Sequence, residues 1–370
     1  MSGAPASTNA ESNLLGLDYR AEAERLGPPV TPIIDVHTHV HGEVAPEIYD
    51  EVRRLFGVTR TYTMTTFESL PALRRVLGDS IRLIAMPRFT APDRLHAMTR
   101  GFTEDLARWH AEGARMCKFW TAPRIIDIAA SLGDPSLLRL DGAVRREQMD
   151  RAAELGMMFM AHIADPDTWF ATRYKEASVY GTKASHYEAL ERMLEAYRVP
   201  WIVAHMGGWP ENLSFLSGLL DRHANLHLDA SATKWMVREL SKHPRADVLA
   251  FFERHSGRLL FGSDIVTLDD HVSSAKVSPM AAGEKARQAS SRAEAFDLYA
   301  SRYFALRTMW ETTHDGPAPF ADGDLKMVDP ARFDDRSSAR LRGVALPPGL
   351  LKRLYRESAE RLVEAWWDRG

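Results

Sequence analysis

The sequence predicts an α/β protein built as a single (β/α)₈ TIM-type barrel, in which helices surround eight parallel strands. Eight short apolar runs recur between residues 31 and 264, and longer segments with helical spacing of apolar residues separate them. Strands that alternate with helices are typical of βαβ units and a parallel sheet, and eight such units fit a closed barrel. An open doubly wound sheet is the alternative, but no G-x-G-x-x-G turn follows an early strand.

The eight apolar runs are interpreted as the barrel strands. In chain order they cover residues 31–39, 58–66, 81–89, 114–120, 156–163, 200–206, 225–230 and 258–264. In such a barrel the loops that follow the strands form the active-site face. Two of these loops, 164–183 and 265–291, are long, and long ordered loops are usually functional. We therefore expect both loops to contribute to a site.

Helical patterns fill most of the intervals between the strands. They cover residues 45–56, 93–112, 141–155, 184–197, 212–222 and 235–255, with an outer helix at 14–26 and a final helix at 350–367. Residues 1–30 are expected to be a partly disordered N-terminal extension. Residues 31–370 are expected to be one barrel domain with a C-terminal helical wrap.

The composition is that of an ordinary globular protein. The 370 residues carry 47 Lys and Arg against 50 Asp and Glu. The resulting net charge of −3 gives no strong field that would recruit nucleic acid or an anionic membrane. No stretch approaches the roughly 20 apolar residues that span a bilayer, and the first thirty residues show no secretory signal. We therefore expect neither nucleic-acid nor membrane partners.

Cysteine and histidine are used very unevenly. The single cysteine, Cys117, cannot form an internal disulfide, which favours a reducing compartment and a cytoplasmic location. Histidine, by contrast, occurs 14 times. Because neutral imidazole is the commonest metal ligand and a proton carrier near neutral pH, the histidines are the first place to look for chemistry.

His37 and His39 form an H-x-H pair at the end of the first strand. On a strand, residues two apart point to the same face, separated by roughly 6–7 Å. Two imidazoles that converge from one strand end can share a metal ion. An H-x-H pair alone is weak evidence, but this pair lies at the end of the strand that forms the catalytic face of a barrel.

Three further polar residues end later strands: His162 ends the fifth, His205 the sixth and Asp264 the eighth. Each by itself has an ordinary structural explanation, such as a hydrogen-bonded histidine or a turn aspartate. A barrel nevertheless brings all of these strand ends to one mouth. Histidine nitrogens and a carboxylate, with room for water, are the ligands that a catalytic divalent metal needs.

Lys118 lies on the fourth strand, where alternation puts it on one face with Met116 and Trp120 and puts Cys117 on the other. An inward lysine at this height would be carboxylated and bridge two metal ions, or would bind an anionic substrate group. The alternative is a lysine that extends past the rim to water. Cys117 is expected to be a buried apolar residue and not a nucleophile.

This order of residues resembles the amidohydrolase superfamily. The segments DVHTHVHG, IVAHMGGWPENL and LLFGSDI are similar to those of its second large family, the amidohydrolase-related metal-dependent hydrolases. That family includes aminocarboxymuconate-semialdehyde decarboxylase, aromatic-acid decarboxylases, and ester or lactone hydrolases. The resemblance covers residues 32–369. It departs from the family in the C-terminal helix, where relatives often carry Asn-Ala and this chain has Ser358-Ala359.

The resemblance implies a principal divalent ion, zinc or else manganese or iron, held by His37, His39, His162 and Asp264. His205 would bind a second ion or polarise the substrate. Lys118 matches the position that some binuclear relatives carboxylate. By analogy with relatives, which are often dimers, a homodimer is one expected assembly.

The function expected from this site is hydrolysis of an ester, lactone or amide carbonyl of a small molecule. Asp264 would be the general base that accepts the proton of the attacking water, and His205 or the metal would stabilise the oxyanion. The expected substrate contacts are Arg88, Trp120, Trp169 and Trp209. Each of these also has a structural alternative, which is a rim ion pair for Arg88 and loop packing for the tryptophans.

Two other functions stay open on the sequence. A metal-dependent nonoxidative decarboxylase of an aromatic or unsaturated carboxylic acid would use nearly the same ligands, and Arg88 or Arg173 directed at the metal would favour it. A metal-binding barrel without enzymatic activity is the third alternative, although it would leave the complete set of ligand positions without a purpose.

Overall fold

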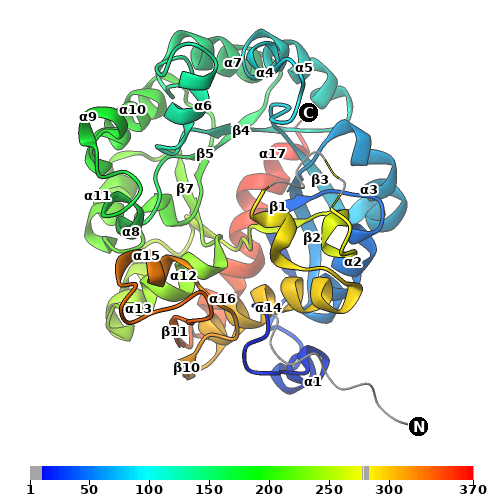
Figure 1. The fold of residues 1–370 in the computed structure, drawn as a ribbon. Coiled ribbons are helices and arrows are strands. Elements are labelled where there is room, and N and C mark those ends of the chain that lie inside the picture. The colour runs from blue at the N-terminus through cyan, green and yellow to red at the C-terminus, as the bar shows by residue number, and fades with distance from the viewer. Residues whose placement is uncertain (1–10, 277, 279–282, 370) are drawn as a thin grey trace.

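In the computed structural model, which describes residues 11–276, 278 and 283–369, parallel strands form the wall of a barrel (Figure 1). The first eight strands follow one another around the wall in chain order, each pairing in parallel with the next, and the ninth pairs in parallel with the first. They are β1 Ile33–Val40, β2 Val58–Met64, β3 Ile81–Ala85, β4 Met116–Trp120, β5 Met158–His162, β6 Trp201–Val203, β7 Leu226–Asp229, β8 Leu259–Leu260 and β9 Ile265–Thr267. The predicted barrel is confirmed.

The eighth strand of the barrel is made in two pieces. β8 pairs with β7, and β9 pairs with β1. Between them, the N–H of Val36 donates to the carbonyl of Phe261 (3.0 Å) and the N–H of Asp264 donates to that of His37 (2.8 Å). The ring is closed by this segment. The prediction that a loop begins at residue 265 was therefore wrong for the first residues, because the chain still hydrogen-bonds to β1 there.

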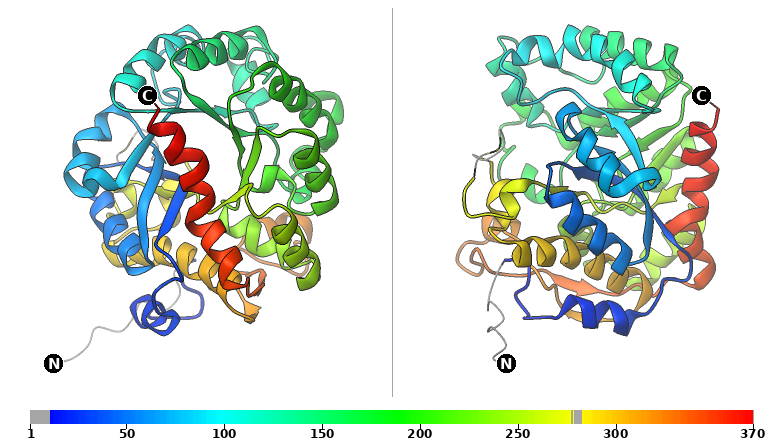
Figure 2. Two further views of the ribbon diagram at one scale, coloured as in Figure 1. Left: turned by 180° about the vertical axis from the view of Figure 1, so that it is seen from behind. Right: turned by 90° about the vertical axis from the view of Figure 1, so that its right-hand side faces the viewer.

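Helices cover the outside of the barrel (Figures 1 and 2). They are α1 Tyr19–Leu26, α2 Ala45–Leu55, α3 Leu70–Leu77, α4 Arg94–Met98, α5 Arg100–Ala111, α6 Ile125–Ser131, α7 Ala143–Glu154, α8 Asp167–Phe170, α9 Ala177–Tyr180, α10 Lys183–Ala196, α11 Leu213–Arg222, α12 Thr233–Leu240, α13 Arg245–Arg254, α14 Arg292–Glu311, α15 Asp324–Val328, α16 Pro348–Lys352 and α17 Ala365–Trp367. A short antiparallel pair, β10 Asp315–Pro317 and β11 Arg340–Arg342, lies beside α12 and α14.

Several helix predictions need correction. The helix expected at 93–112 is divided at Thr99, whose backbone (φ −114°, ψ −114°) is not helical. The helix expected at 235–255 is divided before Pro244, which cannot continue a preceding helix and caps α13 instead. The loop 164–183 contains α8 and α9, and the 20-residue helix α14 was not predicted.

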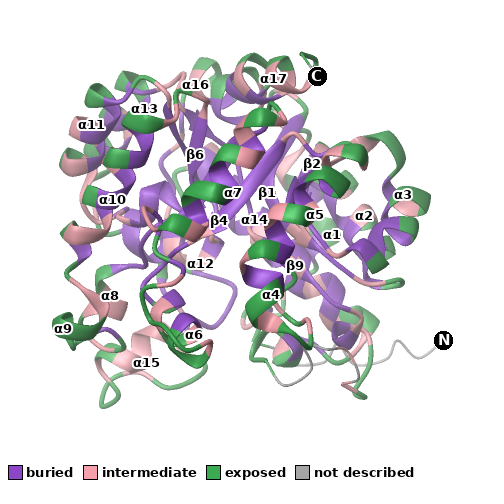
Figure 3. Ribbon diagram, turned by 90° about the horizontal axis from the view of Figure 1, so that it is seen from above, coloured by how far each residue is buried: buried purple, intermediate pink, exposed green. Residues whose placement is uncertain are grey.

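Two apolar layers follow from strand alternation. Inward residues such as Val36, Met158 and Met160 form a core inside the barrel, whereas Cys117 and Phe119 pack between the sheet and the helices. Figure 3 shows the strands buried beneath helices whose outer faces are exposed. Because side chains fill the interior, an active site can lie only at an end of the barrel.

The C-terminal helical segment covers the end of the barrel at which the strands begin (Figure 2, left, red). Its Trp366 and Trp367 indoles donate to the carbonyls of Gly156 (2.7 Å) and Gly113 (3.1 Å), which precede β5 and β4. Because this end is covered, the opposite end, where the strands finish, is left for a site.

At the other terminus, α1 begins at Tyr19 and not at residue 14, because Asp18 caps it by accepting from Arg20 and Ala21. The disorder expected for the start of the extension falls on residues 1–10, which lie outside the described residues. Among the described helices, none has both the length and the hydropathy needed to cross a lipid bilayer.

Candidate metal centre

The end of β1 brings two histidines to the carboxylate of Asp264. His37 Nε2 lies 3.5 Å and His39 Nε2 lies 3.3 Å from Asp264 Oδ1. His37 is buried, whereas the side chains of His39 and Asp264 are 26% and 20% exposed. These three residues form one of two groups in the described chain whose donor atoms lie close enough to share a metal ion. The group is open to solvent on one side.

Strained backbone positions Asp264 and the neighbouring strand ends. Asp264, His205 and Ala232 have φ values of 57°, 60° and 60°, although none of them is glycine. Such left-handed residues cost free energy and cluster at functional sites. Gly262 is required for a different reason, because a Cβ there would lie 2.9 Å from Ser231 Cβ and 3.1 Å from His37 Cβ. The eighth strand can approach β1 and β7 only without a side chain at this point.

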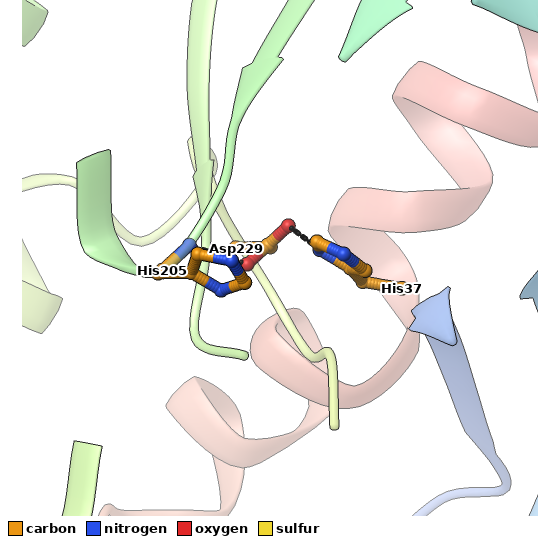
Figure 4. Close-up of side chains that lie close together, drawn as sticks. All are labelled: His37, His205 and Asp229. Atoms are coloured by element: carbon orange, nitrogen blue, oxygen red, sulfur yellow. Dashed lines mark hydrogen bonds and ion pairs between the residues drawn. The ribbon is translucent and has the colours of Figure 1, made fainter. Parts of the chain in front are cut away.

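Asp229, at the end of β7, lies between His37 and His205 and joins them (Figure 4). His37 donates its Nδ1–H to Asp229 Oδ2 (2.8 Å), and the backbone N–H of His205 donates to Asp229 Oδ1 (2.9 Å). Burial raises the pKa of Asp229, but its interaction with His37 holds that pKa well below its usual range. Because a carboxylate can only accept, the His37 proton is fixed on Nδ1 and the Nε2 lone pair faces Asp264.

A second hydrogen-bond path fixes His205. Ser231 donates its hydroxyl proton to Asp229 Oδ1, and the Ser231 oxygen lies 2.8 Å from His205 Nδ1. Since the serine proton is used on Asp229, His205 Nδ1–H must be the donor to Ser231. The Nε2 atom of His205 is then unprotonated and suited to bind a metal. His37, His205 and Asp229 form the second close group of donors, but its carboxylate is already committed to these hydrogen bonds.

Sequence reasoning missed Asp229 and Ser231. Asp229 is the next-to-last residue of the seventh apolar run, and this position alone would have placed it at the mouth with the other strand ends. An acid inside a fully buried strand also requires partners.

Lys118 points into the barrel from β4. Its Nζ lies 3.3 Å from His37 Nε2, and the residue is only 5% exposed. Burial lowers its pKa to about 8, although the carboxylates of Asp229 and Asp264 act in the opposite direction. The lysine therefore faces the histidines and does not extend past the rim.

His162 lies beside the donor group and is engaged elsewhere. Its ring centroid is 4.5 Å from that of His205, but its Nε2 lies 2.9 Å from Asp165 Oδ1. Asp165 also accepts the hydroxyl proton of Tyr174 (2.6 Å), which lies on the long loop after β5. The metal role of His162 therefore stays a prediction.

Two of the expected substrate contacts border the mouth. The Trp120 ring, at the end of β4, meets the His162 ring edge to face at 6.3 Å. Trp169, on α8, packs against Trp235 at 5.8 Å and donates its indole N–H to Asp324 (2.8 Å). Both tryptophans are partly buried, and Trp120 contacts a site histidine directly, whereas Trp169 is connected to the histidines through Trp235.

The other two expected contacts have partners on the outside of the barrel. Arg88 forms an ion pair with Asp105 on α5 (2.8 Å), and its side chain is 42% exposed. Trp209 stacks on Tyr187 (5.5 Å) and packs against Phe215 (4.7 Å), between α10 and α11. Arg88 thus makes the rim ion pair, and Trp209 makes the loop packing, that were the structural alternatives to substrate binding.

Trp235 was not predicted and lies closer to the histidines than any of these. Its ring centroid is 5.4 Å from that of His205 and 6.0 Å from that of His162. The indole donates to Asp324 (3.1 Å), which also pairs with Arg238 (3.0 Å). Trp235 follows the seventh strand in the sequence, and this place after a strand end is the sequence signal that could have predicted it at the mouth.

Comparison with known proteins identifies the family. A model of the family described as Amidohydrolase (Amidohydro_2) matches residues 43–364. The match contains Lys118, His162, His205 and Asp264, and the H-x-H pair lies just before it. No curated protein matches the chain significantly.

Solved structures resemble the chain at low identity. An apo protein of Agrobacterium tumefaciens is 13% identical over 91% of this chain and 97% of its own, with a TM-score of 0.45. A probable 2-pyrone-4,6-dicarboxylic acid hydrolase of Acinetobacter baumannii with citric acid bound is 13% identical over 63% and 84%, with a TM-score of 0.40. A dihydroxybenzoic acid decarboxylase of Polaromonas sp. JS666 with bound manganese and 2-nitroresorcinol is 13% identical over 63% and 86%, with a TM-score of 0.39.

The family model covers most of the chain, and the family depends on a metal, for which the structure offers a histidine–histidine–aspartate site. The chain therefore belongs to the amidohydrolase family and is an enzyme of that superfamily.

Proposed function

We propose that this chain is a metal-dependent hydrolase that cleaves an ester, lactone or amide carbonyl of a small molecule, with Asp264 as the general base. The proposal rests on one observation: His37 Nε2 and His39 Nε2 both lie within 3.5 Å of the same carboxylate oxygen, Asp264 Oδ1. Two imidazoles and a carboxylate, open to water, are typical of catalytic zinc. Zinc is the proposed ion, with manganese or iron as alternatives.

The chemistry of the donors supports a divalent ion. His37 presents an unprotonated Nε2, because Asp229 holds its proton on Nδ1. Burial lowers the pKa of His39 to about 4, against the pull of Asp264, so that this imidazole is neutral at pH 7. Burial raises the pKa of Asp264, but its hydrogen bond with His39 keeps the pKa well below the usual range. The set thus offers two neutral nitrogens and one carboxylate.

In the proposed reaction, Asp264 acts by transferring a proton. When bound, a divalent ion supplies hydroxide near neutral pH, because it lowers the pKa of water to about 7. Asp264 accepts the water proton on its carboxylate and returns it to the leaving group. Its backbone N–H is fixed on the carbonyl of His37, and Met158 and Met160 lie fully buried inside the barrel below. The carboxylate is therefore held in place above a packed apolar interior that excludes water.

His205 and Lys118 are proposed as residues of a second ion. The unprotonated Nε2 of His205 fits a ligand better than a hydrogen-bond donor to an oxyanion. The lowered pKa of Lys118 gives a neutral amine fraction near pH 8, and the neutral amine is the form that carboxylation requires. A second ion would therefore add His205 and a carboxylated Lys118 to the site.

Decarboxylation is the alternative, and the cations that would favour it are engaged elsewhere. Arg88 pairs with Asp105, as described above. The guanidinium of Arg173 lies over the Trp169 ring (4.5 Å), and its Nε is 3.1 Å from Met327 Sδ. Hydrolysis therefore remains the proposed reaction.

Metal analysis of the purified protein, the His37→Ala variant and a His96→Ala control tests the proposal. His96 is an exposed histidine that pairs with Glu104 on the helical surface. We expect at least one equivalent of ion in the native protein and the control, and a loss in His37→Ala.

Aryl esters, lactones and hydroxybenzoates should then be assayed for hydrolysis and for release of CO₂. Ester or lactone cleavage that His37→Ala abolishes is the expected result. CO₂ release without hydrolysis would show that the chain is a decarboxylase and not a hydrolase. In the metal analysis, equal metal content in the native protein and both variants would contradict the metal site.

A further inference from the structure

The backbone of His162 is fixed at the end of β5. Thr121, the residue after β4, donates both its backbone N–H (2.9 Å) and its hydroxyl (3.1 Å) to the His162 carbonyl. The imidazole lies among residues of the site, with its ring centroid 4.5 Å from that of His205 and 6.0 Å from that of Trp235. His162 therefore belongs to the candidate metal centre by position, although one of its ring nitrogens is engaged elsewhere.

Asp165, three residues later, determines which nitrogen of His162 carries the proton. Its Oδ1 lies 2.9 Å from His162 Nε2, and its side chain is only 4% exposed. Because a carboxylate only accepts hydrogen bonds, the proton is on Nε2 and the Nδ1 atom keeps its lone pair. Within the described part of the chain, no hydrogen bond engages that Nδ1. His162 thus retains one unprotonated nitrogen, which is the form that binds a metal ion.

Tyr174 occupies the second oxygen of Asp165. Its phenol donates to Oδ2 (2.6 Å), and burial raises the pKa of Tyr174 well above the usual range, so that the hydroxyl stays a donor at neutral pH. With His162 on one oxygen and Tyr174 on the other, the carboxylate cannot turn without losing a hydrogen bond. Among the described residues, no lysine or arginine forms an ion pair with Asp165, so that these two neutral donors orient it.

The loop after β5 holds Tyr174 by aromatic packing. The Tyr174 ring centroid lies 5.9 Å from that of Trp169 and 5.1 Å from that of Tyr180. The backbone N–H of Tyr174 also donates to the Trp169 carbonyl (2.9 Å). Tyr180 connects this cluster to α6, because its hydroxyl donates to Asp127 (2.9 Å). The packing of the loop therefore sets the position of the carboxylate.

His37 and Asp229 show the same arrangement in a different setting. There too a buried carboxylate accepts from one ring nitrogen (2.8 Å) and leaves the other unprotonated. Asp229, however, ends β7 in the barrel wall, whereas Asp165 lies outside any helix or strand. The wall fixes the first carboxylate permanently, but the second is in place only while its loop is packed.

We propose that Asp165 and Tyr174 are positioning residues of the candidate metal centre, through which the loop after β5 fixes the ring of His162 for metal binding. Asp165 acts by holding the proton on Nε2, and Tyr174 acts by holding Asp165. An ion and the loop should therefore stabilise each other, because such coupling is reciprocal at equilibrium. The inference rests on the metal site of the proposed function and adds this loop to it.

Competition with a chelator measures the zinc affinity of three variants. In Asp165→Asn the amide can accept or donate, so that the proton of His162 is no longer confined to Nε2 and the affinity should fall by about 10- to 100-fold. Tyr174→Phe removes one hydrogen bond and should lower the affinity by about 2- to 10-fold. Tyr180→Phe is the matched control, because its ring belongs to the same cluster but its hydroxyl contacts Asp127, and it should retain native affinity.

Two spectroscopic readouts separate positioning from a purely structural role. In metal-free protein labelled with ¹⁵N-histidine, the ring signals that His162→Gln removes should show a proton on Nε2. Asp165→Asn should change these signals to a mixture of the two tautomers. In the cobalt-substituted protein, the visible absorption spectrum should change in Asp165→Asn and stay native in Tyr180→Phe.

Trypsin tests the reciprocal effect on the loop. Arg173 and Lys175 flank Tyr174 and are both exposed, so that cleavage after either of them, located by mass spectrometry, reports opening of the loop. Saturating zinc should slow this cleavage in the native protein and in Tyr180→Phe, and much less in Asp165→Asn. Equal slowing in all three proteins would show that the ion and the loop are not coupled through Asp165.

The outcomes keep this inference separate from the proposed hydrolase. Weaker zinc binding in Asp165→Asn, in a protein that cleaves no ester or lactone, would refute the hydrolase and retain the positioning pair. Native zinc affinity, tautomer and cobalt spectrum in Asp165→Asn, with hydrolysis intact, would overturn the inference and retain the hydrolase. If Asp165→Asn does not fold, the zinc affinity of Tyr174→Phe relative to Tyr180→Phe decides in the same way.

Discussion

At the scale of single residues, one buried carboxylate sets the chemistry of its neighbours. Asp229 accepts from His37 and from the backbone of His205, and through Ser231 it also fixes the ring of His205. As a consequence, the imidazoles of His37 and His205 present unprotonated Nε2 atoms to the mouth of the barrel. A residue that binds no ion itself can in this way decide whether ions bind.

The Asp229→Asn variant tests this role. The amide keeps the shape of the side chain but no longer enforces the proton on His37 Nδ1, so that metal affinity should fall by about 10- to 100-fold. Competition with a chelator of known affinity measures the effect. Asp105→Asn, which alters a partly buried aspartate on α5, should retain native affinity. Native affinity in Asp229→Asn would show that the hydrogen bond does not orient the ligand.

At the scale of elements, α14 ties the first strand to the eighth. The Tyr303 hydroxyl donates to Asp35 on β1 (2.8 Å) and lies 2.9 Å from the hydroxyl of Tyr49. Asp35 also accepts from Ser263 and from the backbone of His37. Burial raises the pKa of Asp35 to about 7, although these hydrogen bonds lower it. A helix outside the barrel thus holds both strands that carry the donor atoms.

Tyr303→Phe removes one donor from this network. The oxygen of Asp35 loses a partner in a fully buried place, so that the free energy of unfolding should fall by about 1–3 kcal/mol. Urea unfolding of the variant measures this loss. Tyr180→Phe makes the same change on the exposed hydroxyl that donates to Asp127 and should cost much less. Equal costs for the two variants would mean that the Asp35 network adds no stability.

At the scale of the whole molecule, closure of the barrel creates the site. His37 and Asp264 are separated by most of the chain, yet β9 pairs with β1 and brings their side chains to 3.5 Å. The C-terminal helical segment covers the opposite end. Because the donors come from the first and last strands, an ion bound there links the two ends of the barrel.

Metal binding should therefore stabilise the whole fold. At a free zinc concentration 100 times the Kd, the expected gain is about 2.7 kcal/mol. Differential scanning calorimetry with and without zinc measures the rise in Tm. Asp264→Asn should lose most of this rise, whereas Asp221→Asn, an exposed aspartate paired with Arg254, should keep it. A full rise in Asp264→Asn would place the ion elsewhere.

Periodicity predicted what depends on local contacts. The eight apolar runs gave the barrel, and alternation gave the inward direction of Lys118. Helix α14 was missed because apolar residues are buried on nearly all of its faces, which leaves no one-sided pattern. The division at Thr99 was missed because nothing local marks it, whereas the division before Pro244 was available from the proline itself.

The sequence by itself determined the fold class, the family and the set of strand ends from which His37, His39, His205, Lys118 and Asp264 come. These depend on spacing along the chain, which folding preserves. The tertiary structure decided the partners. It put Asp229 between His37 and His205 and paired Arg88 with Asp105. Such pairings join residues far apart in the chain, and their distances follow from barrel closure and helix packing, which local spacing does not encode.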